Sequence, residues 1–504
     1  MILRCPHPRP YFGLALLLGG LACSHPSSPP EAAPAANAPA PTADADAAAV
    51  DDAFRAAAPP SQPTPPLRAP VPRRTLLSNG LTVLTVHKPG LPIVHASLVI
   101  RSGSAADPAD QEGLAGFTAD MLEMGTQSLS AAQLAERVEG YGTSINIEVD
   151  EDTTSLSTTA LAEHFPGVFA ILAEMAQQPA FAVAEVERVR KSRSATLAQS
   201  QDSPQYAASA AFRRVVFGSH PYAHLPLGSS RTVAKIQRSQ LQSFYKSHYR
   251  PANSALILVG DLDDAAALTA AQAAFGAWQG PRAQRPNPPP PRARAAEVSL
   301  VARPDAPQSQ LVLGHLGVAR EDPDYYALVL CNAILGGVFN SRINMNLREA
   351  HGYTYGTYSH FDFMRQRGAF WVAGGIRTDA TEAAVREILK EIGTLREVAV
   401  TDAELQSFKS RYTISLPSAF QTVSRIADMV ARIDLFDLPL DYYQHLPELI
   451  EAVTPADVLR VAQTHLRPPE LNVVVVGDPA QVGPGLTHLG RGPLHRRSAT
   501  GEPN

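Results

Sequence analysis

Cysteine is scarce in this 504-residue sequence, which has only Cys5, Cys23 and Cys331. Three cysteines cannot form the disulfide framework of a small secreted scaffold, so the fold has to rest on a hydrophobic core. A strong charge of either sign is also missing, because 43 basic residues stand against 48 acidic ones. The formal net charge of -5 gives no electrostatic reason to expect nucleic acid as a partner.

The first apolar run, residues 11–22, follows Arg4 and Arg9 and is too short to span a bilayer. Basic residues before such a run are typical of a secretory signal. We therefore expect residues 1–22 to be a signal peptide and the protein to be exported.

The apolar run ends in Gly-Leu-Ala-Cys, which resembles the cleavage site of bacterial lipoproteins, although Gly20 stands where that pattern usually has leucine. The resemblance implies that Cys23 carries lipid and anchors the chain to a membrane. Ser24 after it resembles the sorting pattern of outer-membrane lipoproteins that face the periplasm, within the bacterial cell envelope. Ordinary secretion is the alternative. Residues 23–72 are rich in alanine and proline and predict an unfolded tether.

The remainder of the chain repeats itself. Five residues recur 217 positions later at one common offset: His248, Arg250, Pro251, Gly260 and Asp261 return as His465, Arg467, Pro468, Gly477 and Asp478. Such a repeat indicates duplicated domains. We expect an α+β fold in which each domain is an antiparallel-rich sheet covered by helices. The predicted ranges are a first domain over 73–278, a Pro/Arg-rich linker over 279–296, a second domain over 297–480 and a frayed tail over 481–504.

Local signals in the first domain are clear. Asn79-Gly80 between two β-rich runs predicts a hairpin. Ser130 with Gln133 predicts a capping box at the start of a helix, and a further helix is expected over 113–124. Alternating apolar residues over 145–160 predict an antiparallel pair of strands.

Residues 336–355 carry the strongest signal in the second domain. Asn340 can cap a helix whose apolar face holds Ile343, Leu347 and Ala350, and Gly352 supplies the left-handed stop.

Arg348 then lies in the last turn of this helix, and Tyr355 begins the strand that follows. A fixed guanidinium and a phenol so placed are suited to holding a carbonyl oxygen as it becomes negative. An arginine paired with a surface carboxylate and a tyrosine in the core would leave the same sequence pattern.

Several strings resemble the insulinase/pitrilysin family of zinc metallopeptidases, which includes mitochondrial processing peptidase. LGG, SR, LRE and GYTYG over 335–356 are similar to its second-domain signature, and residues 221–230 and 244–261 are similar to parts of its first domain. The resemblance implies that Arg348 and Tyr355 contact the substrate backbone and the oxyanion. It also implies a clamshell of four such domains, of which this chain supplies one half.

The family's zinc motif, HxxEH, is absent from its expected place. The family pattern puts Gly116 and Asp120 where the two histidines would stand, Ala119 where the catalytic glutamate would stand, and Thr196 at the last metal ligand. Tight zinc sites use three or four histidine, cysteine or carboxylate ligands. We therefore expect no metal or other cofactor in this chain.

Two functions remain open. The first is a non-catalytic subunit that partners a related HxxEH-bearing chain in a heterodimeric metalloendopeptidase, where zinc belongs to the partner and peptides or unfolded polypeptides are the substrate. The second is a non-proteolytic envelope lipoprotein that binds extended polypeptides or acts as an assembly module. Peptidase activity of the chain alone is not expected.

Overall fold

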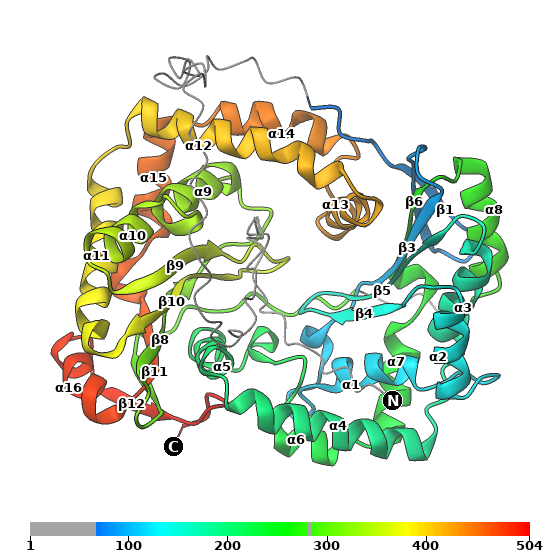
Figure 1. The fold of residues 1–504 in the computed structure, drawn as a ribbon, viewed down its shortest axis with the longest axis horizontal. Helices are drawn as coiled ribbons and strands as arrows, with labels where there is room; N and C mark the ends of the chain where they lie inside the picture. The colour runs from blue at the N-terminus through cyan, green and yellow to red at the C-terminus, as the bar shows by residue number, and fades with distance from the viewer. Residues whose placement is uncertain (1–66, 281–284, 504) are drawn as a thin grey trace, which may run out of the picture. The chain divides into compact units, whose positions relative to one another are not determined.

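The structure is a computed structural model that describes residues 67–280 and 285–503. The expected signal peptide, Cys23 and most of the tether lie outside these residues. The described chain has an α+β fold with two six-stranded sheets, each covered by helices, so the predicted fold class is confirmed (Figure 1).

The first sheet has the strand order β1-β2-β6-β3-β5-β4, and only β2 and β6 pair in parallel. Its strands are β1 (Arg73–Leu76), β2 (Thr82–His87), β3 (Ile93–Ile100), β4 (Asn146–Val149), β5 (Thr154–Leu161) and β6 (Ser254–Gly260). Gly80 has a φ of +89° in the turn between β1 and β2, as the Asn-Gly pair predicts. The predicted pair over 145–160 is β4 with β5.

The second sheet has the order β12-β7-β11-β8-β10-β9. Its strands are β7 (Val298–Ala302), β8 (Gln308–Leu316), β9 (Thr354–Phe361), β10 (Ala369–Arg377), β11 (Asn472–Gly477) and β12 (Leu494–Arg497). Five strands of each sheet follow the same order, because β7, β11, β8, β10 and β9 stand where β2, β6, β3, β5 and β4 stand in the first. The repeated glycines Gly260 and Gly477 end the equivalent strands β6 and β11. The duplication predicted from the sequence is therefore present in the fold.

Helices of each half cover one face of that half's own sheet. In the first half (residues 67–280) they include α1 (Leu114–Asp120), α2 (Ala131–Gly140), α3 (Phe165–Gln177), α4 (Val183–Gln201), α6 (Ser230–Lys235), α7 (Arg238–His248) and α8 (Asp264–Phe275). In the second half (residues 285–503) they include α9 (Tyr325–Asn332), the π-helix η6 (Ala333–Gly337), α10 (Arg342–Asn344), the π-helix η7 (Met345–Ala350), α11 (Thr381–Glu397), α12 (Asp402–Ser415), α14 (Tyr442–Glu451), α15 (Pro455–His465) and α16 (Pro479–His488). The predicted capping box of Ser130 and Gln133 begins α2.

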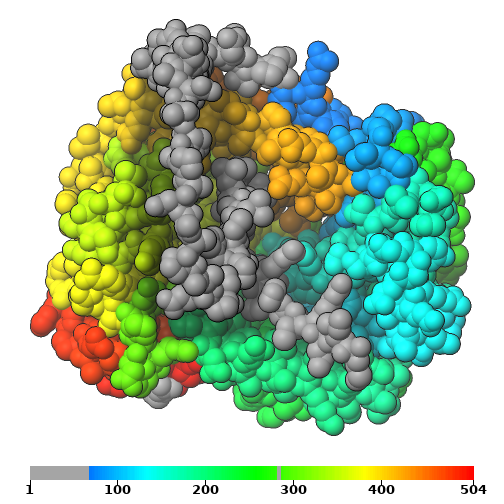
Figure 2. Space-filling view, viewed as in Figure 1, coloured from blue at the N-terminus to red at the C-terminus, as the bar shows by residue number. Residues whose placement is uncertain are grey.

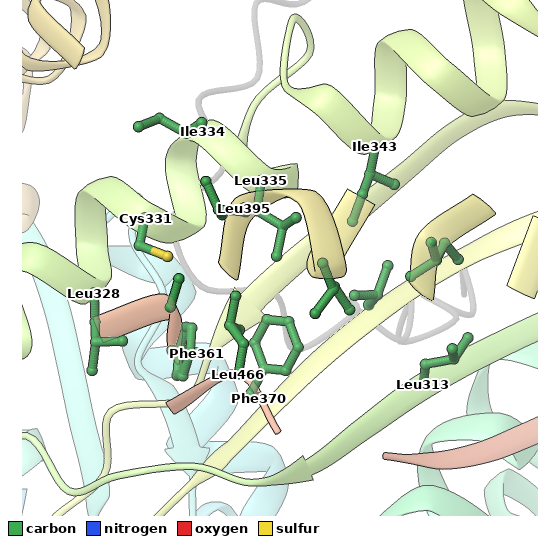
Figure 3. Close-up of a cluster of buried hydrophobic side chains, with 14 of the residues drawn as sticks. Leu313, Leu328, Cys331, Ile334, Leu335, Ile343, Phe361, Phe370, Leu395 and Leu466 are labelled. Atoms are coloured by element: carbon green, nitrogen blue, oxygen red, sulfur yellow. The ribbon is translucent and has the colours of Figure 1, made fainter. Parts of the chain in front are cut away.

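The core of the second half forms between its sheet and α9. Leu328 and Cys331 of α9 pack with Phe361 and Phe370 of the strands (Figure 3). The stretch Tyr325–Ala350 is long and apolar enough to cross a membrane by length and composition, and 50% of its apolar window is buried in this fold. Its apolarity is therefore used in the core of the described chain.

Two equivalent helices are exchanged between the halves. Helix α5 (Pro204–Phe217) follows α4 in the first half, yet Phe212 packs on the second sheet beside Val474 of β11. Helix α13 (Val423–Leu435) belongs to the second half, yet it lies beside the strands of the first sheet (Figure 1), and the space-filling view shows the orange part of the chain next to the blue part (Figure 2). Its Ile426 packs with Ile257 of β6. Both central strands are thus buried on both faces, which explains their continuous apolar sequences. Leu67–Asn504 consequently groups as one compact unit.

Both ends of the folded part differ from the sequence prediction. Ala69 and Pro72, predicted as tether, are buried, and Gln444 donates to the Ala69 carbonyl at 3.1 Å. The predicted tail over 481–504 is wrong for residues 481–503, which contain most of α16 and all of β12. Strand β12 pairs with β7, and Arg497 Nε donates to Glu297 Oε1 at 2.9 Å. The Gly- and Pro-rich composition gave no sign of the β12–β7 pairing or of the Arg497–Glu297 ion pair, because backbone pairing needs no apolar pattern.

Candidate functional site

The helix before Gly352 differs in detail from its prediction. It begins after Ser341 rather than at Asn340, and it continues from α10 into the π-helix η7. Ile343 and Leu347 are buried as predicted, whereas Ala350 is exposed. A π-turn places more residues in each turn than an α-helix does, so Ala350 rotates off the apolar face. Gly352 has a φ of +63°, as the left-handed stop requires.

Arg348 lies in the last turn of η7 and is held on three sides. Its Nη1 donates to the Tyr355 carbonyl at 3.0 Å, and its Nε lies 3.1 Å from Glu349 Oε1. The Phe339 ring stacks on the guanidinium, with its centroid 4.5 Å from the guanidinium carbon. Within the described chain no hydrogen bond uses Nη2, so the guanidinium is both fixed in place and able to donate outward.

Tyr355 is 86% exposed near the start of β9, so it is not the core tyrosine of the alternative prediction, whereas the ion pair of Arg348 with the exposed Glu349 agrees with the arginine half of that alternative. Strand β9 is at the edge of the second sheet and pairs only with β10 among the described strands. The phenol makes no hydrogen bond to the rest of the described chain. Arg348 and Tyr355 therefore meet at one open edge and offer two kinds of donor, a guanidinium N–H and a phenol O–H.

The three motif positions Gly116, Ala119 and Asp120 lie on α1. Asp107 holds the start of this helix, since its carboxylate accepts from Gly113 N at 2.8 Å and from Ala115 N at 2.7 Å. Burial raises the pKa of the Asp107 carboxyl to about 7, although these two hydrogen bonds act against the rise. Helix α1 is thus well formed although it lacks the histidines and the glutamate of HxxEH.

Arg193 of α4 occupies the space beside Gly116 and Asp120. Only 5% of Arg193 is exposed, its Nη1 lies 2.5 Å from Asp120 Oδ2, and its Nη2 donates to the Pro226 carbonyl at 2.6 Å. A Cβ atom on Gly116 would lie 3.0 Å from Arg193 Nη2 and would press on the Pro226 carbonyl oxygen. A histidine side chain therefore has no room at position 116, because the Arg193 guanidinium and the Pro226 carbonyl take up that space, and the same guanidinium is paired with Asp120.

The last of the four positions, Thr196, lies one turn beyond Arg193 on α4. Its hydroxyl donates to the Ser192 carbonyl of its own helix at 3.1 Å. Zinc needs three or four histidine, cysteine or carboxylate ligands. These four positions offer a glycine, an alanine, a threonine and an aspartate that is already paired with arginine, so they do not fit zinc. Sequence reasoning missed Arg193, although it lies only three residues before Thr196 on the same helix.

Both halves match known domains. Residues 82–223 match the domain described as Insulinase (Peptidase family M16), and residues 235–412 match the Peptidase M16 inactive domain. The chain belongs to the insulinase family. It is 27% identical over 425 residues to an uncharacterized zinc protease of Mycobacterium tuberculosis, an alignment that covers 83% of this chain and 96% of the relative. It is 22% identical over 389 residues to the uncharacterized zinc protease YmxG of Bacillus subtilis, covering 77% and 93% of the two chains.

Solved structures share the fold. The peptidase M16 inactive domain from Pseudomonas fluorescens superimposes with a TM-score of 0.76 at 26% identity, covering 81% of this chain and 98% of that one. A protease from Helicobacter pylori gives a TM-score of 0.76 at 18% identity, covering 81% and 100%. The latter similarity bears on the fold alone.

One other group of side chains in this insulinase-family protein comes close enough to hold a metal. It is the only such group among the residues described, and it consists of Asp322, Asp324 and His465. Asp324 already accepts from Arg460 Nη2 at 2.7 Å and contacts His465 Nε2 at 2.8 Å. These contacts hold the pKa of the Asp324 carboxyl below its usual value, with Arg460 as the first cause. The group is satisfied as an ion-pair network within the second half.

Proposed function

We propose that this chain is the zinc-free subunit of a two-chain metalloendopeptidase, and that its partner is a related chain bearing HxxEH. The supporting observation is the division of the chemistry. Arg193 fills the space of the metal site on α1, whereas Arg348 and Tyr355 remain free to donate. A chain that keeps only half of a reaction's groups is useful when another chain supplies the rest.

In the complex, Arg348 and Tyr355 act in trans by donating to the oxygen of the peptide carbonyl that would be hydrolysed at the partner's zinc site. Preformed donors aimed at a developing negative charge stabilise the transition state without reorganising. Arg348 meets this requirement, because Phe339, Glu349 and the Tyr355 carbonyl already fix its guanidinium. The substrate is a peptide or an unfolded polypeptide.

The edge strand β4 supports both this function and its alternative. Within residues 67–280 and 285–503 it pairs only with β5 and so forms one edge of the first sheet, and the edge of a sheet is where an extended peptide can add as a further strand. Peptide binding at such an edge requires no metal. A non-proteolytic lipoprotein that binds polypeptides or serves in assembly would use the same strand.

The site of action that we propose is the bacterial cell envelope. The chain is exported, Cys23 carries the lipid that anchors it to the outer membrane, and the folded part faces the periplasm. Mass spectrometry of the mature N-terminus tests this, because a lipid-bearing Cys23 is expected as the first residue. An unmodified terminus elsewhere would leave ordinary secretion.

Co-purification from envelope extract distinguishes the two functions. A tagged full-length chain is recovered under mild detergent, its partners are identified by mass spectrometry, and zinc is measured in the complex and in the chain alone. We expect a related chain with HxxEH, zinc in the complex, and no stoichiometric zinc in the isolated chain. Recovery of the chain without any such partner would favour the binding module.

A further inference from the structure

A cleft of about 400 Å³ lies away from both the Arg348 site and α1, and no residue of either lines it. It opens between the edge of the first sheet and the end of α13, beside the segment that joins the halves. Its lining residues are Arg74, Leu76, Thr82, Arg101, Ala252, Asn253, Arg285, Asp434 and Asp437. Both halves of the chain thus contribute to its walls.

The base of the cleft is a buried ion pair. Arg101 grips Asp434 with two donors, Nε to Oδ2 at 2.9 Å and Nη2 to Oδ1 at 2.8 Å. Arg74 Nη2 adds a third contact to Asp434 Oδ1 at 3.2 Å. The single negative charge of Asp434 is therefore shared by two guanidinium groups, and Arg101 alone suffices to bind it bidentately.

Arg285 brings a third guanidinium. Its Nη2 donates to the Leu435 carbonyl at the end of α13 at 2.6 Å. Its nearest carboxylate, Asp437, is 82% exposed and 3.7 Å from Nη1, beyond hydrogen-bond distance. Burial first, and then Arg365 and Arg101, lower the pKa of Arg285 to about 10, while Asp437 and Asp434 act against this shift.

Donor groups remain unused around the cleft. Among the described residues, no hydrogen bond is made by Nε or Nη1 of Arg74 or by Nη1 of Arg285. Three guanidinium groups face two carboxylates here, and one of those carboxylates is turned to solvent. The cleft therefore combines spare N–H donors with an excess of positive charge.

We propose that this cleft binds a small phosphate-type oxyanion between the guanidinium groups of Arg74 and Arg285. Planar guanidinium forks match the oxygens of phosphate, and arginine cannot lose its charge in a protein. The bound anion joins β1 of the first half to the end of α13 from the second, and so stabilises the contact between the halves. The ligand is free phosphate or the terminal phosphate of a small metabolite. This site is independent of the peptidase-subunit function.

Thermal unfolding of the full-length chain tests the site, with inorganic phosphate as the probe and sodium chloride at matched ionic strength as the reference. A ligand that binds only the folded state raises Tm in proportion to the logarithm of its concentration once the site fills. We expect Tm to rise by several degrees as phosphate is added, and to follow this logarithmic dependence once phosphate reaches the millimolar range. A phosphate monoester is titrated in parallel, and tighter binding of the monoester would assign the metabolite as the ligand.

Variants separate binding from the general salt effect, because phosphate also stabilises proteins by exclusion from their surface. Arg74→Gln leaves Asp434 bound by Arg101, and Arg285→Gln removes the second guanidinium. Each should weaken phosphate binding at least tenfold, while Arg386→Gln, an exposed arginine on α11, should behave as wild type. Tm without phosphate reports the folding of each variant. A phosphate effect that is absent from wild type, or equal in all four proteins, would overturn the proposal.

Discussion

Single residues decide the metal chemistry of this protein. The sequence predicted that Gly116, Ala119, Asp120 and Thr196 do not form a zinc site. It did not show that Arg193 takes the space, because the two residues that Arg193 contacts, Asp120 and Pro226, lie far from it in the sequence. The Arg193 guanidinium links α4 to α1 and to the Pro226 segment.

Replacing Arg193 by methionine should therefore destabilise the fold. The change removes two hydrogen bonds of a charged donor, and because Asp120 is 45% exposed and can be hydrated, we expect a loss of about 2–3 kcal/mol in the free energy of unfolding. Urea denaturation measures it, with Arg188→Met on the same helix as the control, since Arg188 is 58% exposed. Equal stability of the two variants would show that Arg193 does not hold this region.

The burial of His315, again a single residue, should make the stability of the fold depend on pH. Its Nε2 accepts from Arg467 N at 3.1 Å and its Nδ1 contacts the Leu316 carbonyl at 3.0 Å, so the neutral ring is fixed as the Nδ1–H tautomer. Burial, and then Arg467, lower its pKa from 6.5 to about 4. The unfolded imidazole takes up a proton below pH 6.5 but the folded one does not, so its stabilisation is complete above pH 6.5 and is lost toward pH 4.

Between pH 7 and pH 5, wild type should therefore lose about 2 kcal/mol more stability than His315→Gln. Urea denaturation at the two pH values gives the comparison. His95, His248 and His360, whose pKa values are also lowered to about 4, titrate in both proteins, so only the difference reports His315. Parallel losses in the two proteins would mean that His315 is not held neutral.

At the scale of elements, local sequence signals of the first half predicted a turn and a helix start correctly. They did not predict that α5 and α13 pack on the sheet of the other half. The Asn79-Gly80 hairpin, the capping box at Ser130 and the duplicated strand order follow from sequence, because each depends on neighbouring residues or on the repeat. The π-turn of η7 and the placement of α5 and α13 depend on which sheet each segment meets. No periodicity within α13 distinguishes the first sheet from the second.

The exchange of α13 gives a specific expectation. Ile426 is 2% exposed against the first sheet, so Ile426→Ala should cost about 3 kcal/mol and lower the stability of both halves together. Thermal unfolding should remain one transition at a lower Tm. Leu449→Ala, at a partly exposed leucine of α14, serves as the control. A second transition that kept the wild-type Tm would show that the halves unfold independently.

At the scale of the whole molecule, the chain has the fold of the insulinase family. The family and the fold class were readable from the sequence, because the second-domain signature and the repeat survive intact. The sequence did not reveal that both ends of the folded part pack into the fold. The burial of Ala69 and the pairing of β12 depend on backbone contacts, which leave no signal in the composition. The role of Arg348 and Tyr355 stays a prediction that only a complex with its partner can test.

Turnover of a model peptide by the reconstituted complex is the decisive measurement. Arg348→Ala and Tyr355→Phe should each lower kcat about a hundredfold to a thousandfold, because a preformed oxyanion donor contributes roughly 3–4 kcal/mol to the transition state. Tyr355 is exposed, Arg348 is partly exposed, and neither change opens a cavity in the core. Assembly should therefore be unchanged and the loss of stability about 1 kcal/mol or less, as in the control Arg377→Ala at an exposed arginine of β10. Wild-type turnover in both variants, or loss of activity only through unfolding, would contradict the account.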